Sequence, residues 1–183
     1  NGEEDGDLDR DPQERNLMWS RLLEQHESAP FALLLQGGDQ IYADEATKGH
    51  PLSEDWPDSV PSDPGAEALE GLRAHLRDRF ARRYLRVLTA DPCERLFAEI
   101  PALSIWDDHD ICDGWGSQPA ESTHSAVGRL LFSVAREMYL LFQHAATDAD
   151  IPDLFWEPSG RNLGWRRDLP GLTIFAPDLR SQR

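Results

Sequence analysis

Hydrophobic residues recur at helical spacing in several stretches of the chain. The longest stripe predicts a helix over residues 66–88, because its apolar side chains recur every three or four positions: Leu69, Leu72, Leu76, Phe80, Tyr84 and Val87. A second stripe, with Val127, Leu131 and Val134 among its members, predicts a helix over residues 124–146. A weaker pattern predicts a helix over residues 13–27, with Leu17, Met18 and Leu22 on its inner side. A short helix is expected over residues 91–100, with Asp91 as its N-cap.

Continuous apolar runs alternate with these helices. Residues 31–35 are a short run between Pro30 and the pair Gly37-Gly38, which is typical of a strand covered on both faces of a parallel sheet. Two further runs, residues 102–106 and 172–176, also predict strands. The order helix, strand, helices, strand, helix, strand predicts an α/β fold with a layered sheet. Residues 43–65 are rich in proline and acids and poor in apolar side chains, so we expect a loop insertion there.

The length of 183 residues suits one domain, and 39% hydrophobic residues are enough for a packed core. We expect residues 1–12 to be an acidic disordered lead-in and residues 13–183 to be the folded part. The chain starts at Asn1 without a targeting segment, which predicts an internal fragment and leaves localisation open, with a lean to the cytoplasm. No apolar run approaches the roughly 20 residues of a membrane span. Two cysteines, Cys93 and Cys112, make neither a disulfide framework nor a zinc motif.

The charge is strongly negative and unevenly distributed. Acids number 34 against 18 bases, giving a net charge of -16, which excludes nucleic acid and anionic membrane as default partners. Residues 71–90 invert this sign, because six arginines face one acid, Asp78. Two interpretations stay open for this basic helix: ion pairing with the acidic segments, or an anion-binding face.

Acidic residues follow two of the predicted strands. The first is followed by the segment 36–44, which contains Asp39 and Tyr42, and the second by the segment 107–117, which contains four aspartates and His109. Ligands gather beyond the carboxyl ends of strands in α/β sheets, and crowded carboxylates there repel one another unless a cation is bound. Oxygen and imidazole donors suit hard metals such as iron(III), manganese, magnesium or calcium. In the alternative interpretation Tyr42 is a core aromatic residue and Asp39 caps a turn.

Three blocks carry a resemblance to a known family. The block Gly38-Asp39-Gln40-Ile41-Tyr42 resembles the GDxxY block of iron-containing metallophosphoesterases. The block from Ile105 to Asp110 resembles the WDDHE/D block of the PhoD-like alkaline phosphatase D family, and the block from Ala176 to Arg183 resembles its later LDxRxxR segment. The three blocks occur in the family's order over residues 31–183. The resemblance implies a calcineurin-like metallophosphoesterase fold, a sandwich of two β-sheets between helical layers, which is incomplete in this chain.

The resemblance also implies metal ligands. Asp39 would bridge two or more metal ions, Tyr42 would be the phenolate ligand of Fe(III), and Asp108 would ligate a second metal, which the family suggests is Ca(II). Other metals are compatible with the same donors. Asp107 and Asp110 would orient these ligands by hydrogen bonds or shape the loop.

The implied reaction is hydrolysis of a small phosphate ester, a phosphomonoester or a phosphodiester. His109 would contact the substrate phosphate and protonate the leaving oxygen as a general acid. Arg180 and Arg183 would either neutralise phosphate charge or pair with the acidic loops.

The family's opening and closing ligand segments are absent, so we expect about half a site, weak metal binding and little turnover by this chain alone. Two alternatives remain: a family relative that has lost catalysis, and an acidic α/β interaction module whose tryptophans pack or contact a partner, namely Trp106, Trp115, Trp156 and Trp165. The ester, the metal pair and the oligomeric state stay open.

Overall fold

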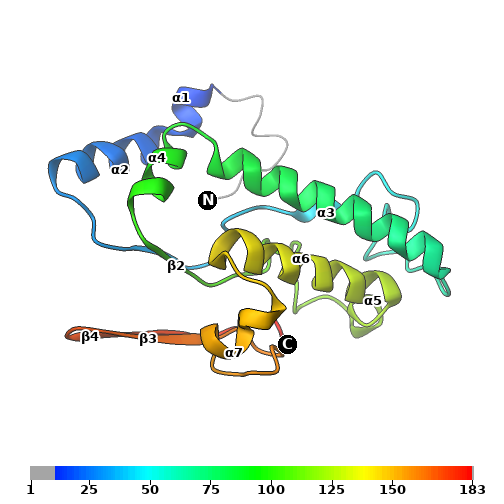
Figure 1. Ribbon diagram of the computed structural model, residues 1–183. Coiled ribbons are helices and arrows are strands. Elements are labelled where there is room, and N and C mark those ends of the chain that lie inside the picture. Colours follow the sequence, from blue (N-terminus) through cyan, green and yellow to red (C-terminus); the bar gives the residue numbers. More distant parts are fainter. Residues whose placement is uncertain (1–10, 183) are drawn as a thin grey trace.

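The computed structural model describes residues 11–182 and has a mixed α/β architecture, as predicted (Figure 1). Its elements in chain order are α1 (Pro12–Arg15), α2 (Leu17–Ser28), β1 (Leu34–Gln36), η2 (Asp44–Thr47), α3 (Ala66–Leu88), α4 (Cys93–Glu99), β2 (Ala102–Ser104), α5 (Ala120–Thr123), α6 (Ala126–His144), η3 (Asp148–Asp150), α7 (Ile151–Leu154), β3 (Trp165–Leu169) and β4 (Leu172–Ala176). None of the described helices is both long enough and apolar enough to cross a membrane.

Helices α3 and α6 run side by side and form the main core (Figure 1). Their apolar stripes face each other, so that Leu72, Leu76 and Phe80 of α3 are fully buried, as are Leu131 and Val134 of α6. The predicted bounds of α3 are confirmed to the residue. Helix α6 begins two residues later than predicted, because the Ser125 hydroxyl caps it by accepting the N–H of Gly128 at 2.9 Å.

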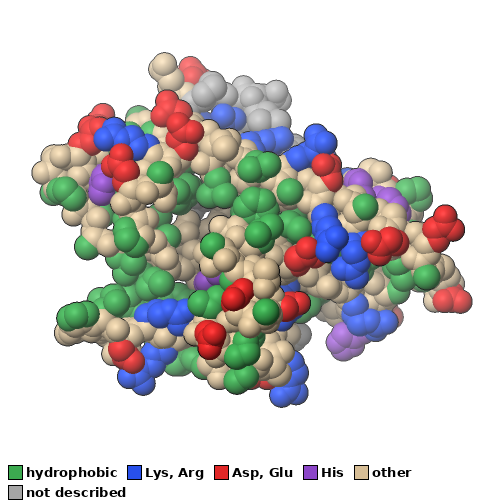
Figure 2. Space-filling view, in the orientation of Figure 1, with side chains coloured by type: hydrophobic (Ala, Val, Ile, Leu, Met, Phe, Trp, Pro, Cys, Tyr) green, Lys and Arg blue, Asp and Glu red, His purple; other side chains and the backbone are tan. Residues whose placement is uncertain are grey.

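The strands form two small sheets. Strand β1 pairs with β2 in parallel, with Leu35 opposite Leu103, which confirms the predicted parallel pairing. The expectation that both faces are covered is wrong for β1, because Leu35 is 59% exposed. Strand β4 does not join this sheet. It pairs antiparallel with β3, which the sequence pattern did not predict, in a hairpin that carries exposed hydrophobic side chains (Figure 2).

Several predicted boundaries and inner faces need correction. The helix expected over residues 13–27 is two helices, α1 and α2, and Leu17 and Met18 are exposed instead of facing inward. Helix α4 begins at Cys93 with Pro92 at its N-cap position, so Asp91 does not cap it. The short helix α5 was not predicted. Residues 1–10 of the expected lead-in lie outside the described residues.

The predicted insertion at residues 43–65 consists of turns around the short helix η2. Trp56 anchors it, because its ring is buried against Trp115 with centroids 6.3 Å apart and its Nε1 donates to the carbonyl of Ser122 at 3.3 Å. The insertion therefore packs on the core. Of the four tryptophans considered for partner binding, Trp106, Trp115 and Trp165 are also buried, whereas Trp156 is 42% exposed.

Candidate metal centre

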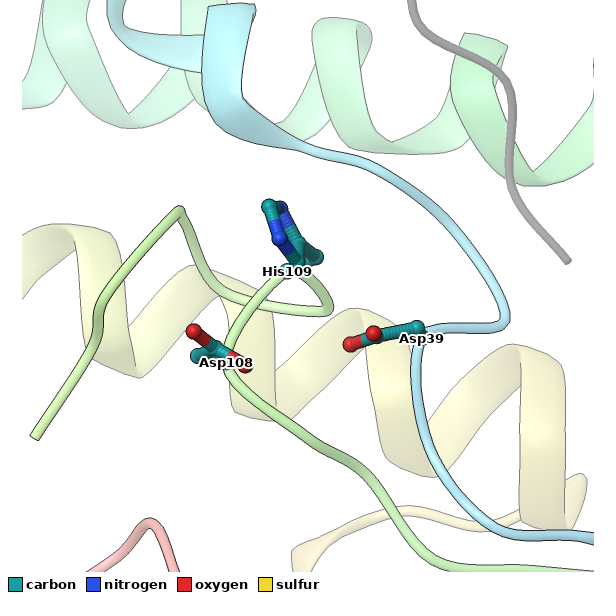
Figure 3. A group of neighbouring side chains, drawn as sticks. All are labelled: Asp39, Asp108 and His109. Atoms are coloured by element: carbon teal, nitrogen blue, oxygen red, sulfur yellow. The ribbon is translucent and has the colours of Figure 1, made fainter.

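The parallel pairing of β1 and β2 brings together the two acidic loops that follow them. Oxygen atoms of Asp39 and Asp108 and a ring nitrogen of His109 lie within 4.8 Å of one another. Figure 3 shows the side chain of Asp39 extending from the first loop toward Asp108 of the second, with His109 above them. The structure thus unites three of the predicted site residues.

The first loop turns sharply at two residues with left-handed backbone conformation, Gly38 (φ 114°) and Asp39 (φ 53°). A Cβ on Gly38 would lie 2.5 Å from the Cβ of Asp107, closer than carbon atoms can approach. Only glycine therefore lets the two loops pass at this distance, and this contact aims Asp39 at the second loop.

Asp110 connects the two loops through hydrogen bonds to the backbone of both. Its Oδ2 accepts the backbone N–H of Asp39 at 2.8 Å and that of Asp107 at 3.0 Å, while its Oδ1 accepts the N–H of Ile41 at 3.4 Å. Burial raises the pKa of Asp110 to about 7, although these N–H groups act to lower it. Its contacts are those of a residue that shapes the loops.

His109 is oriented by a residue that the sequence did not single out. The Asp44 carboxylate accepts the Nδ1–H of His109 at 2.9 Å, and the His109 carbonyl accepts the N–H of Ala43 at 2.8 Å. Burial acts to lower the pKa of His109, but Asp44, Asp39 and Asp108 together raise it. The signal for Asp44 was its place in the same acidic segment, five residues after Asp39.

Tyr42 packs its ring against His109, with centroids 4.2 Å apart and planes tilted by 31°. It is half-buried. The structure therefore places Tyr42 beside the group formed by Asp39, Asp108 and His109, on the loop that carries Asp39.

Arg180 approaches the centre from the C-terminal segment and pairs with the second acidic loop. Its Nε donates to Asp107, one terminal nitrogen lies 3.3 Å from Asp108 Oδ1, and the other donates to the Trp115 carbonyl at 3.0 Å. Pairing with the acidic loops, one of the two roles left open by the sequence, is thus observed. Arg183 lies outside the described residues.

Asp178 holds Arg180 in place, and the sequence interpretation gave it no role. Its buried carboxylate accepts the backbone N–H of Arg180 at 2.9 Å, the indole N–H of Trp106 at 3.0 Å and the N–H of Leu163 at 2.7 Å. Burial acts to raise the pKa of Asp178, but hydrogen bonds from Ser181 and these groups lower it. The feature of the sequence that could have identified Asp178 is its position two residues before Arg180.

The residues present fit a bound cation. Asp39 Oδ1 is buried without a hydrogen-bond partner, and burial together with Asp107 and Asp108 raises the pKa of Asp39 despite the opposing effect of His109. A metal ion would satisfy this oxygen and offset the repulsion among the carboxylates. Cys112 is not a comparable donor, because burial raises the pKa of its thiol well above the usual range.

Comparison with known proteins gives two matches. The model of a family described as PhoD related phosphatase matches residues 13–183. An uncharacterized protein of Saccharomyces cerevisiae is 28% identical over 144 residues, which cover 69% of this chain and 20% of that protein. The chain thus spans about a fifth of the length of this relative. No solved structure gives a significant match.

Proposed function

The chain belongs to the PhoD related phosphatase family, as its three sequence blocks predicted, and we propose that it contributes to the site of a metal-dependent phosphoesterase. The observation that carries this proposal is the convergence of Asp39, Asp108 and His109 within 4.8 Å at the ends of two parallel strands. The substrate is a small phosphate ester, either a monoester or a diester.

Asp39, Tyr42 and Asp108 are the residues that would hold the metal ions, with iron(III) and calcium(II) as the pair that the family resemblance favours. Carboxylate and phenolate oxygens are donors that such hard cations prefer. The chemistry supplied by these ions, when bound, is polarisation of a phosphoryl oxygen and activation of water at neutral pH.

His109 is the proposed general acid. Asp44 engages its Nδ1, which leaves Nε2 as the nitrogen that donates a proton to the leaving oxygen of the ester. Asp44 also favours the protonated imidazole, because its carboxylate accepts the Nδ1–H. The ring contact with Tyr42 restricts rotation of the imidazole, so His109 keeps one orientation toward the substrate.

Arg180 is proposed to balance negative charge at this centre. Its pairs with Asp107 and Asp108 connect it to the second loop, and its positive charge would offset the negative charge that a bound phosphate adds to that of the carboxylates. Asp110 is proposed to act through the backbone of both loops.

The test uses the whole protein and chromogenic phosphate esters, p-nitrophenyl phosphate for monoesterase and bis-p-nitrophenyl phosphate for diesterase activity. We expect Asp39→Asn and His109→Ala each to reduce hydrolysis by about a hundredfold or more. Matched controls are Asp63→Asn and His124→Ala, which remove the same groups from exposed positions. Full activity in both site variants would exclude the assigned roles.

Metal analysis by mass spectrometry separates ligand loss from loss of the acid. Asp39→Asn is expected to lower the metal content of the whole protein, whereas His109→Ala retains the ions proposed for Asp39 and Asp108. Stoichiometric, tightly bound iron in this chain alone would contradict the expectation that it carries about half of the site.

A further inference from the structure

A cluster of basic side chains lies on α3, outside the candidate metal centre. Arg79, Arg82, Arg83 and Arg86 are spaced by three and four residues, so they share one face of the helix. Together they line a small pocket that also includes Ala43 and Ala46. Figure 1 shows the segment around η2 running alongside α3, and the two elements are in contact. We call these six residues the arginine pocket.

The innermost arginine is nearly enclosed. The Arg83 side chain is 8% exposed and lies 3.5 Å from a carboxylate oxygen of Glu45, while Arg79 donates to the Glu45 carbonyl at 3.0 Å. Arg82, at the rim, pairs with Asp78 at 2.8 Å. The arginine pocket thus gathers four guanidinium groups in a chain with a net charge of -16.

The small side chains opposite the arginines leave room for a ligand. Ala43 and Ala46 are three residues apart around the turn of η2 and present methyl groups to the pocket. A tetrahedral anion with several oxygens can accept from several guanidinium groups at once, which a single carboxylate cannot. Burial of part of the pocket strengthens such hydrogen bonds.

We propose that the arginine pocket binds the phosphate group of a small soluble ligand. The proposal concerns residues other than those of the metal centre, so it goes beyond the proposed function. The two sites nevertheless share one segment. The N–H of Ala43 donates to the His109 carbonyl at 2.8 Å, and the next residue, Asp44, orients the His109 ring. A phosphate in the arginine pocket therefore lies against the segment that positions the proposed general acid.

The test is calorimetric titration of the whole protein with inorganic pyrophosphate in the presence of a chelator, which removes metal-dependent binding. The double variant Arg82→Gln, Arg86→Gln is compared with Arg73→Gln, Arg77→Gln. The second pair lies on the same helix with the same change of charge, but its partners are Glu70 and Glu137. We expect saturable binding whose dissociation constant rises about tenfold or more in the first variant and less than about twofold in the second.

The remaining outcomes are equally informative. Asp39→Asn is expected to bind pyrophosphate as the wild type does, so the result stands whether or not the protein hydrolyses esters. If the double variant fails to fold, as thermal unfolding would reveal, the single exposed change Arg82→Gln is expected to weaken binding measurably. Absence of saturable binding to the wild type would overturn the proposal, as would equal weakening by the two double variants.

Discussion

Acid should destabilise this protein through one half-buried histidine. His144 ends α6, and its ring packs edge-on between those of Tyr139 and Phe155, with centroids at 4.8 and 5.1 Å. Its Nε2 is buried without a hydrogen-bond partner. Burial, aided by the charge of Arg167, lowers the pKa of His144 from 6.5 to about 4. The folded state therefore holds this imidazole neutral.

The sign and size of the effect follow from these two values. Well above pH 6.5 the imidazole is neutral in both the folded and the unfolded state, so its titration does not change the free energy of unfolding. As the pH falls toward 4, the unfolded chain binds a proton that the folded chain does not, so stability is lost over this interval and the loss is complete below it. The full loss is about 3 kcal/mol at 1.36 kcal/mol per pKa unit. At about pH 4.5 these two pKa values give about 2.5 kcal/mol, and we expect about 2 kcal/mol because the ring is partly exposed to solvent.

Urea denaturation followed by tryptophan fluorescence, at about pH 7.5 and about pH 4.5, measures this loss. Other groups also titrate over this interval, so the informative quantity is the difference between the wild type and His144→Gln. The variant should lose about 2 kcal/mol less than the wild type on acidification. His124→Gln, at an exposed position, is the matched control. Equal losses in the wild type and His144→Gln would refute the idea of a neutral buried imidazole.

Two further predictions concern the loops of the metal centre. Gly38→Ala should lower the free energy of unfolding by about 1–3 kcal/mol and reduce metal content, because its Cβ would collide with Asp107. Gly37→Ala, which meets no atom within 4 Å, is the control, and equal stability of the two variants in urea would count against the close approach. Asp44→Asn should reduce ester hydrolysis about tenfold or more while the metal content stays unchanged, because the imidazole loses its carboxylate partner. Wild-type turnover in that variant would show that Asp44 does not orient the acid.

The sequence was most informative where the regular spacing of apolar residues in one segment decides the structure. The stripe from Leu69 to Val87 defined α3 completely, because one face of a long helix must be buried whatever it packs against. The parallel pairing of β1 and β2 was also predictable, and with it the meeting of their two acidic loops. The meeting of these two loops is as much of the site as short-range patterns in the sequence can specify.

The errors occurred where tertiary pairing decides. Strand β3 contains Arg166, Arg167 and Asp168, so it has no apolar run, and its partner is set by the turn at Pro170 and Gly171. Leu35 lies in an apolar run but is mostly exposed, because burial depends on neighbours that the run itself does not specify.

Within the site, side-chain pairing was the unpredictable part. The turn of η2 directs the Asp44 carboxylate toward His109, which is 65 residues away in the sequence. The sequence offered two roles for Arg180, and the hydrogen bond from its backbone to Asp178 fixes the segment so that its side chain reaches Asp107. Spacing alone does not encode such contacts.

The hydrogen bond from the Asp39 N–H to the Asp110 carboxylate also bears on the order in which parts of the chain fold. These residues are 71 positions apart, so closing the loop between them carries an entropic cost of about 4 kcal/mol from its length. Helix α3, whose contacts along its own backbone are local, can form far sooner. The two acidic loops therefore meet late, and on the ribosome the first one waits until the segment with Asp110 has emerged.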